Sequence, residues 1–203
     1  MPVVETCRLP VDGGGAVFCE VTGDGQPLVL THDAIVHRET WDAQFEPLSR
    51  WYRMVRWDRR GYGRSDEPDA HYASDEDLAR VIDSLTEPPA ILMGCSNGGL
   101  LSLQCALKHP NLVAALVLVG PIVSVLGVTE HYTSRGGRRP GGDLTAAGEI
   151  EYWTSTDLLW TAPANTGARD RLRALLTANP NNLQPKNTWN GHLSLSYWHY
   201  WVR

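Results

Sequence analysis

Short apolar runs alternate with amphipathic stretches over about the first 120 residues of this 203-residue chain. Four runs have the length and composition of buried strands: Pro27–Thr31, Tyr52–Trp57, Ala90–Gly94 and Leu112–Gly120. Three stretches between them carry apolar residues at helical spacing: Glu39–Arg50, Ser74–Leu85 and Gly98–Lys108. Strands and helices in this alternation predict an α/β fold with a mostly parallel sheet and flanking helices.

Two details of this pattern lead to local predictions. Val3–Arg8 and Ala16–Thr22 flank a turn cluster at Asp12–Gly15, which predicts an antiparallel hairpin before the parallel strands. Leu112–Gly120 is apolar throughout, which is typical of a parallel strand covered on both faces. Ser74 is the expected N-cap of the helix that follows it.

The pattern changes after Pro121. Residues 127–142 are rich in Gly, Arg and Ser and predict a long loop, and helical stretches follow at about 144–160, 168–178 and 188–202. Five of the eight tryptophans lie beyond residue 150, and no further strand is evident. We therefore expect a core at residues 1–125 and a helical cap or lid region at residues 126–203.

Composition narrows the range of partners. A net charge of −5 argues against nucleic acid, and no apolar run reaches the length of a membrane span, so we expect neither a nucleic acid nor a membrane partner. No signal peptide is visible, and the four cysteines form no CxxC pair, which favours free thiols in a cytoplasmic protein. Without a dinucleotide-binding motif, a P-loop or a metal-ligand cluster, we expect no cofactor and no metal, and a small-molecule substrate as partner.

The sharpest motif is Gly94-Cys95-Ser96-Asn97-Gly98, a G-x-S-x-G pattern where a strand must become a helix. A tight turn there holds the serine in a strained conformation and exposes its hydroxyl, and the flanking glycines avoid clashes with neighbouring backbone. The backbone N–H of Asn97 is the expected oxyanion donor. The alternative is a glycine-rich helix start in which Ser96 is only the N-cap.

Two more motifs follow strands: His32-Asp33-Ala34 and the segment Asp58–Asp66, which reads D-R-R-G-Y-G-R-S-D. With the serine motif, they make residues 3–125 resemble the α/β-hydrolase fold superfamily, in particular small serine hydrolases with a helical cap. The resemblance implies that Ser96 is the nucleophile and that Ala34, or its neighbour, provides a second oxyanion N–H. It also implies a mainly structural role for Asp58–Asp66. The expected pocket-lining residues are His32, Asp33, Cys95, Trp153 and Trp160.

One departure from the family lies beside the expected oxyanion hole. Asp33 occupies the position where the family usually has glycine, and a carboxylate there opposes the charge that develops on the oxyanion. Asp33 either faces solvent or caps the helix from Glu39, or else the site no longer performs simple acyl transfer.

The larger departure concerns the catalytic triad. The family order is Ser, then an acid, then His, with the last two placed after further strands. Those strands are missing from the pattern, so we interpret the chain as C-terminally truncated. His192 and His199, in the last predicted helix, are weak candidates for the base, and packed or solvated roles are the alternative.

The function that we predict is hydrolysis of an ester, lactone or amide bond in a small apolar or aromatic substrate. The alternative is a catalytically inactive or non-hydrolytic pocket of the same fold that binds a ligand or acts as a cyclase. Without further strands, residues 112–119 form an apolar sheet edge. We therefore expect a homodimer through this edge, a contact of the edge with the cap helices, or poor solubility.

Overall fold

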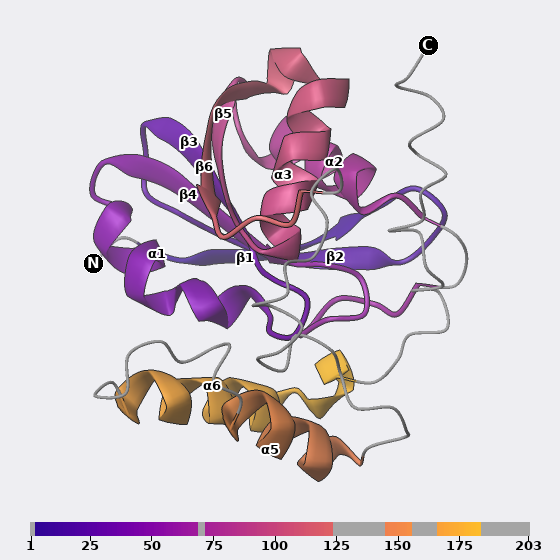
Figure 1. Cartoon of the computed structure of the whole chain (residues 1–203). Coiled ribbons are helices and arrows are strands. Elements are labelled where there is room, and N and C mark those ends of the chain that lie inside the picture. Colours follow the sequence, from indigo (N-terminus) through magenta and orange to yellow (C-terminus); the bar gives the residue numbers. More distant parts are fainter. Residues whose placement is uncertain (1–2, 69–71, 124–144, 156–165, 184–203) are drawn as a thin grey trace.

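The computed structural model describes residues 3–68, 72–123, 145–155 and 166–183 (Figure 1). Its sheet has six strands in the order β1-β2-β4-β3-β5-β6. They are β1 (Glu5–Pro10), β2 (Ala16–Thr22), β3 (Gln26–Thr31), β4 (Tyr52–Asp58), β5 (Ala90–Cys95) and β6 (Val113–Val119). The β1–β2 and β2–β4 pairs are antiparallel, and the β4–β3, β3–β5 and β5–β6 pairs are parallel. The predicted α/β class and mostly parallel sheet are confirmed.

Helices cover both faces of this sheet. In the core they are the 3-10 helix η1 (Arg38–Trp41), α1 (Asp42–Leu48), α2 (Ser74–Leu85), α3 (Asn97–Lys108) and the 3-10 helix η2 (Pro110–Leu112). α2 and α3 pack on one face, where Leu78, Ile82 and Cys105 join a cluster with Trp57. Phe45 of α1 packs with residues of the other face. Because side chains alternate between the two faces along each strand, the sheet has one apolar cluster on each face.

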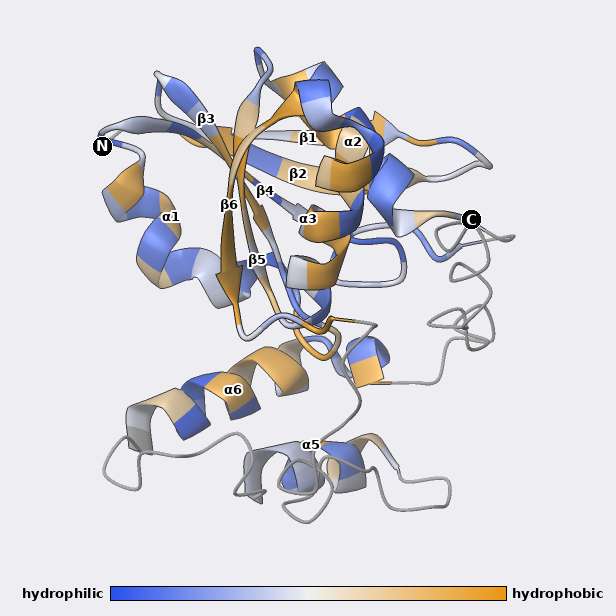
Figure 2. Cartoon of the chain, turned by 45° about the horizontal axis from the view of Figure 1, so that its top comes forward, coloured by the Kyte–Doolittle hydropathy of each residue, from blue (hydrophilic) through white to orange (hydrophobic). Residues whose placement is uncertain are grey.

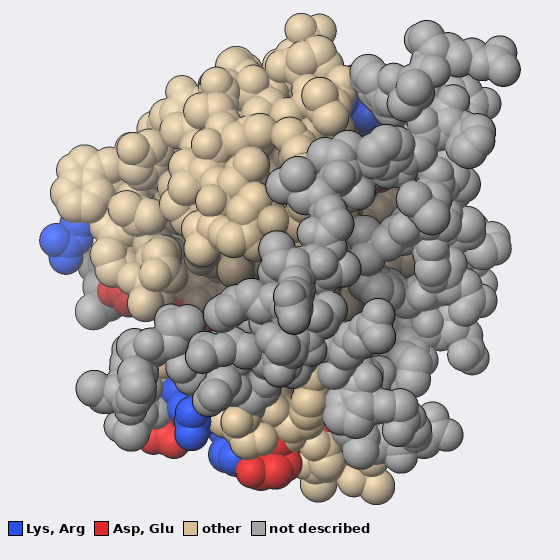
Figure 3. Space-filling view, viewed as in Figure 1, with Lys and Arg blue, Asp and Glu red and all other residues tan. Residues whose placement is uncertain are grey.

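A second layer of helices lies beside the core, below it in Figure 1. It consists of α5 (Ala146–Ser155), α6 (Thr166–Ala178) and the 3-10 helix η4 (Pro180–Leu183). Leu175, Leu176 and Leu183 of this layer bury Val36 of the core. In Figure 3 the charged side chains gather mainly over α5 and α6, whereas the core shows few of them on this face. The predicted loop at 127–142 and helix at 188–202 lie outside the described residues.

Two local predictions were wrong. β6 is not covered on both faces: Val117 and Val119 are 40% and 48% exposed, and within the described ranges no strand lies beyond β6 (Figure 2). The N-cap of α2 is Ala73, which makes no side-chain capping bond, and Ser74 is the first helical residue.

Among the helices that the structure describes, none is long and apolar enough to cross a membrane.

Candidate active site

Ser96 lies between the end of β5 and the first residue of α3, with φ 51° and ψ −114°. It is the only non-glycine residue with positive φ in the described part of the chain. Its N–H donates to Val119 O at 3.0 Å, and its carbonyl accepts from Ile122 N at 3.1 Å. The surrounding backbone thus holds a conformation that an L-residue rarely adopts. Ser96 stands at the N-cap position of α3, but its side chain makes no capping hydrogen bond, so the alternative in which the Ser96 hydroxyl serves only to cap the helix is not supported.

The glycines of the motif allow this turn to pack. A Cβ on Gly94 would lie 2.3 Å from Gly98 O, and one on Gly98 would lie 2.3 Å from Thr31 O. A Cβ on Gly99 would lie 2.8 Å from the Cβ of Pro121. The predicted need for glycine at positions 94 and 98 is therefore confirmed. The close approach also brings the start of α3 against the end of β3 and the loop that follows it.

His32 begins that loop and is fully buried. Its Nδ1 lies 2.8 Å from Asp33 O, and its Nε2 lies 3.0 Å from the backbone nitrogen of Arg59, whose N–H it accepts. Burial and the Arg59 cation hold the pKa of His32 well below its usual value. The ring is thus neutral, with Nδ1–H donating to Asp33 O. Both nitrogens are engaged, so His32 positions the loop and has no free nitrogen to act as the base.

Asp33 is half-buried and does not cap the helix from Glu39, so both structural alternatives that we predicted for it were wrong. Its Oδ1 accepts hydrogen bonds from the N–H groups of Ile35 at 2.7 Å and Val36 at 3.1 Å, and these close a turn within the loop. Burial raises the pKa of the Asp33 carboxyl, while these hydrogen bonds and the Arg59 charge partly offset that effect. The carboxylate therefore shapes the loop around Ala34.

Arg59 joins this loop to the serine turn. Its guanidinium donates one hydrogen bond to Asn97 Oδ1 and another to Asp33 O at 2.9 Å, and it lies 4.6 Å from the centre of the Tyr62 ring. Asn97 is the first residue of α3, so no carbonyl of its own helix can accept its backbone N–H. The hydroxyl of Tyr62 donates to Ala34 O at 2.9 Å. One buried cation thus connects both segments that are expected to supply oxyanion donors.

The second helical layer contacts the same loop through Asn182 of η4. The Asn182 Nδ2 lies 3.2 Å from His37 Nδ1, and its Oδ1 accepts the N–H of Gly63 at 3.2 Å. The side-chain nitrogen of Asn179 lies 3.1 Å from His37 Nε2. Sequence reasoning gave no role to His37, Asn179 or Asn182. No local motif marks them, because the contact joins segments about 140 residues apart.

The other predicted pocket residues and the candidate histidines fall in different parts of the chain. Cys95 is half-buried, and burial, with a smaller effect of the Asp33 charge, raises its pKa to about 11. Trp153 packs against the apolar cluster that contains Val36 and Leu176. Trp160, His192 and His199 lie outside the described residues. His109 is the C-cap of α3 and contacts Glu76, so a whole helix of 12 residues separates it from Ser96.

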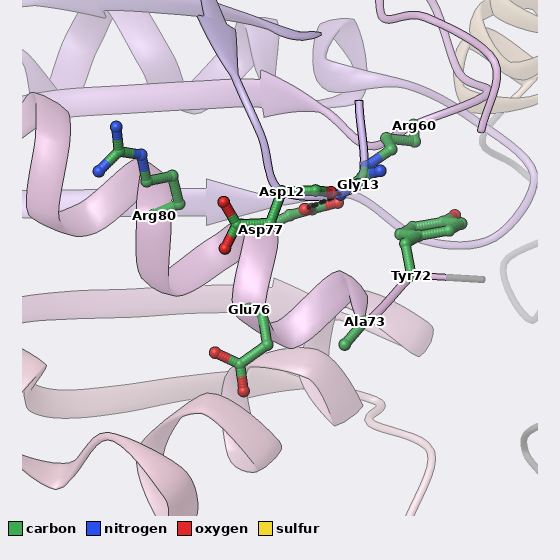
Figure 4. A pocket seen from close by; sticks show the side chains of 8 residues that line it. All are labelled: Asp12, Gly13, Arg60, Tyr72, Ala73, Glu76, Asp77 and Arg80. Carbon is green, nitrogen blue, oxygen red and sulfur yellow. Dashed lines mark hydrogen bonds and ion pairs between the residues drawn. The ribbon is translucent and has the colours of Figure 1, made fainter. Parts of the chain in front are cut away.

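A pocket is present elsewhere in the core, between the β1–β2 turn and the start of α2 (Figure 4). Arg60 lies in it, paired with Asp77 at 2.6 Å and stacked on Tyr72 at 4.5 Å. Its lining includes no residue of the serine turn or of the loop after β3. In the described ranges, no group of three or more His, Cys, Asp or Glu is placed to hold a metal ion.

Comparison with known proteins shows the family. Residues 26–158 match the family model of the alpha/beta hydrolase fold. The chain belongs to this family. The matched segment contains β3 to β6, the serine turn and both loops that Arg59 joins.

Three similar proteins illustrate this membership. A pimeloyl-acyl-carrier-protein methyl ester esterase of Vibrio cholerae is 36% identical over 104 residues, which cover 51% of this chain and 40% of that protein. A 2-hydroxy-6-oxo-2,4-heptadienoate hydrolase of Pseudomonas putida is 30% identical over 143 residues, which cover 67% of this chain and 52% of that protein. The crystal structure of a hydrolase from Pseudomonas aeruginosa PA01 matches with a TM-score of 0.66 at 27% identity, covering 88% of this chain and 69% of that structure. The chain thus spans about half the length of these two curated relatives.

Proposed function

We propose that this chain is the nucleophile-bearing part of a hydrolase that cleaves an ester, lactone or amide bond through Ser96. The observation that carries the proposal is the backbone of Ser96, held at positive φ between a strand and a helix, with no side-chain capping bond. A serine that only capped a helix would bond to that helix and have an extended backbone. Strain maintained by backbone contacts from β6 is typical of a nucleophile turn.

The reaction follows from this arrangement. Ser96 Oγ attacks the substrate carbonyl carbon while a base takes its proton, and the carbonyl oxygen becomes an oxyanion that the N–H groups of Asn97 and Ala34 stabilise. The bond to the leaving group then breaks, and that group takes the proton from the base. Water attacks the acyl-serine in the same way and releases the acid and free Ser96.

An apolar substrate is the class that the cap favours. The loop that carries Ala34 continues into Ile35 and Val36, which pack against leucines of α6 and Trp153 of α5. Apolar and aromatic side chains that gather over a site select apolar substrates. The names of the two curated relatives, a methyl ester esterase and a hydrolase of an oxo acid, support a substrate that has a carbonyl group.

A serine of ordinary pKa needs a base to attack efficiently. Within the described residues both nitrogens of His32 are engaged, and His109 lies at the far end of α3. His192 and His199 are the candidates predicted from the sequence, and a histidine in a longer form of the chain is the alternative.

A fluorophosphonate probe tests the proposal directly. We expect covalent labelling at Ser96 and hydrolysis of a p-nitrophenyl ester, both lost in Ser96→Ala. The matched control is Ser102→Ala in the same helix, since the Ser102 hydroxyl is buried and donates to Gly98 O at 2.9 Å. Substitution of His192 or His199 by Gln then shows whether either one is the base. Activity that survives in Ser96→Ala contradicts the proposal, and tight ligand binding without labelling favours the non-hydrolytic alternative.

A further inference from the structure

The β1–β2 hairpin places two cysteines face to face. Cys7 is the direct register partner of Cys19, and both are free thiols. Side chains of directly opposed residues in an antiparallel pair lie on the same face, with Cα atoms roughly 4.5–5.5 Å apart. A disulfide spans Cα separations of about 4.4–6.8 Å. The backbone of this hairpin therefore permits a bond between the two sulfur atoms.

The two thiols differ in access to solvent. Cys19 is completely buried in the core cluster under α2 and α3, whereas Cys7 is half-buried and packs at the margin of that cluster. β1 is the last strand in the order of the described sheet, so Cys7 lies on an edge strand. A small reagent from solvent thus meets Cys7 first, and Cys19 lies behind it.

The two thiols also differ in chemistry. Contact with the Cys19 thiol lowers the Cys7 pKa to about 7, although burial and the charge of Glu5 act in the opposite direction. The same contact, with burial and the charges of Asp58 and Glu20, raises the pKa of Cys19. Since the thiolate is the reactive form, Cys7 is the nucleophile of the pair and Cys19 is a protonated neighbour.

We propose that Cys7 and Cys19 form an oxidation site, in which a peroxide oxidises Cys7 and Cys19 resolves the product to a disulfide. In the first step the Cys7 thiolate attacks one peroxide oxygen, the O–O bond breaks, and the released hydroxide takes a proton to become water. In the second step the Cys19 sulfur attacks the Cys7 sulfenic acid, and its proton leaves with the hydroxyl group as a second water. The peroxide is reduced by two electrons, and the pair of thiols is oxidised by two.

The other two cysteines provide an internal comparison. Burial raises the pKa of Cys95 to about 11 and that of Cys105 to about 12, so both remain thiols at neutral pH. Cys95 lies opposite Val119 in the sheet, and Cys105 lies in helix α3. A peroxide should therefore discriminate among the four cysteines, with Cys7 reacting first.

Two measurements on the native wild-type chain test this site, and neither depends on Ser96. Brief alkylation with iodoacetamide at pH 7, followed by peptide mass spectrometry, should modify Cys7 more than about tenfold faster than Cys95, with a rate that rises through pH ~7. Treatment with hydrogen peroxide should remove two hydrogen atoms from the intact mass, and mapping should place one disulfide between Cys7 and Cys19.

Variants then separate the two roles. In Cys19→Ser the sulfenic acid at Cys7 should persist long enough for dimedone to trap it, and in Cys7→Ser the peroxide-dependent mass change should disappear. Cys105→Ser is the matched control, because it removes a buried thiol from the same core cluster and should leave the reaction intact. A wild-type chain that keeps four thiols under peroxide, or that alkylates first at Cys95, overturns the proposal.

Discussion

Arg59 donates a hydrogen bond to the side-chain oxygen of Asn97 across 38 residues of sequence. The same guanidinium donates to Asp33 O, so the start of α3 and the loop after β3 share one buried cation. In the reaction that we propose, these two segments supply the oxyanion donors, and a displacement of a catalytic group by about 1 Å can lower the rate roughly 10²-fold. Arg59 is thus a positioning residue for the proposed reaction.

Arg59→Met should lower the rate of Ser96 labelling or ester hydrolysis by about 10²-fold, mainly through kcat, because both hydrogen bonds of the guanidinium are lost. Arg59→Lys should restore part of the rate, since it keeps the charge and one donor. Arg60→Lys is the control: it changes the next buried arginine, whose partner is Asp77 of α2. Equal losses in the Arg59 and Arg60 variants would indicate a structural role alone.

Asn182 couples the second helical layer to the core, because its amide contacts both His37 and Gly63. Asn182→Ala removes both hydrogen bonds, and each such bond contributes about 1 kcal/mol. We expect backbone amides at 35–38 to exchange with deuterium roughly tenfold faster in this variant, by hydrogen-exchange mass spectrometry. Asn181→Ala, at the exposed neighbouring position, should leave exchange unchanged. Unaltered exchange in Asn182→Ala contradicts this coupling.

The Asp33 carboxyl makes stability depend on pH. Burial raises its folded-state pKa above the ordinary 3.8, so the folded protein holds this proton more tightly than the unfolded chain does. The stabilising effect of the raised pKa is complete below pH ~3.8 and is lost as pH rises through the folded pKa. Asparagine keeps an oxygen for the two N–H donors and removes the charge.

Asp33→Asn should therefore have a higher free energy of unfolding than the wild type at pH 7, and the difference should shrink toward pH ~3.8 in urea titrations. Asp83→Asn, at an exposed position of α2, is the control and should show a smaller change. A difference that grows toward acid pH has the opposite sign and would refute the assignment.

The β6 edge predicts association. Val117 and Val119 expose apolar surface along a strand that pairs with β5 on one side. Apolar edge strands without charge pair with other chains, and a lysine placed there opposes such pairing. We expect a concentration-dependent increase in mass by light scattering, reduced in Val117→Lys. Leu107→Lys, which alters a more exposed apolar residue on α3, should leave association unchanged. A wild-type chain that stays monomeric at high concentration rules out this homodimer.

Local patterns were sufficient for most elements of the core. Ala16–Thr22 and Ser74–Leu85 begin and end where the sequence predicts, because residue spacing and breakers act within a few positions. The serine motif was equally readable, since its glycines are required by a turn that lies within the motif itself. The prediction that β6 is covered on both faces was wrong, because an apolar run shows only the composition of a strand and does not show which strand or helix packs against it.

By itself, the sequence determined the order of strands and helices, the strained turn at Ser96 and the family to which the chain belongs. Only the tertiary structure decided the surroundings of that turn: that Arg59 joins Asn97 to the loop after β3, that Asp33 closes a turn, and that Asn182 contacts His37. The physical reason is distance along the chain. Hydrogen bonds and ion pairs between segments far apart in sequence depend on how the sheet and the second helical layer pack, and no local pattern encodes that geometry.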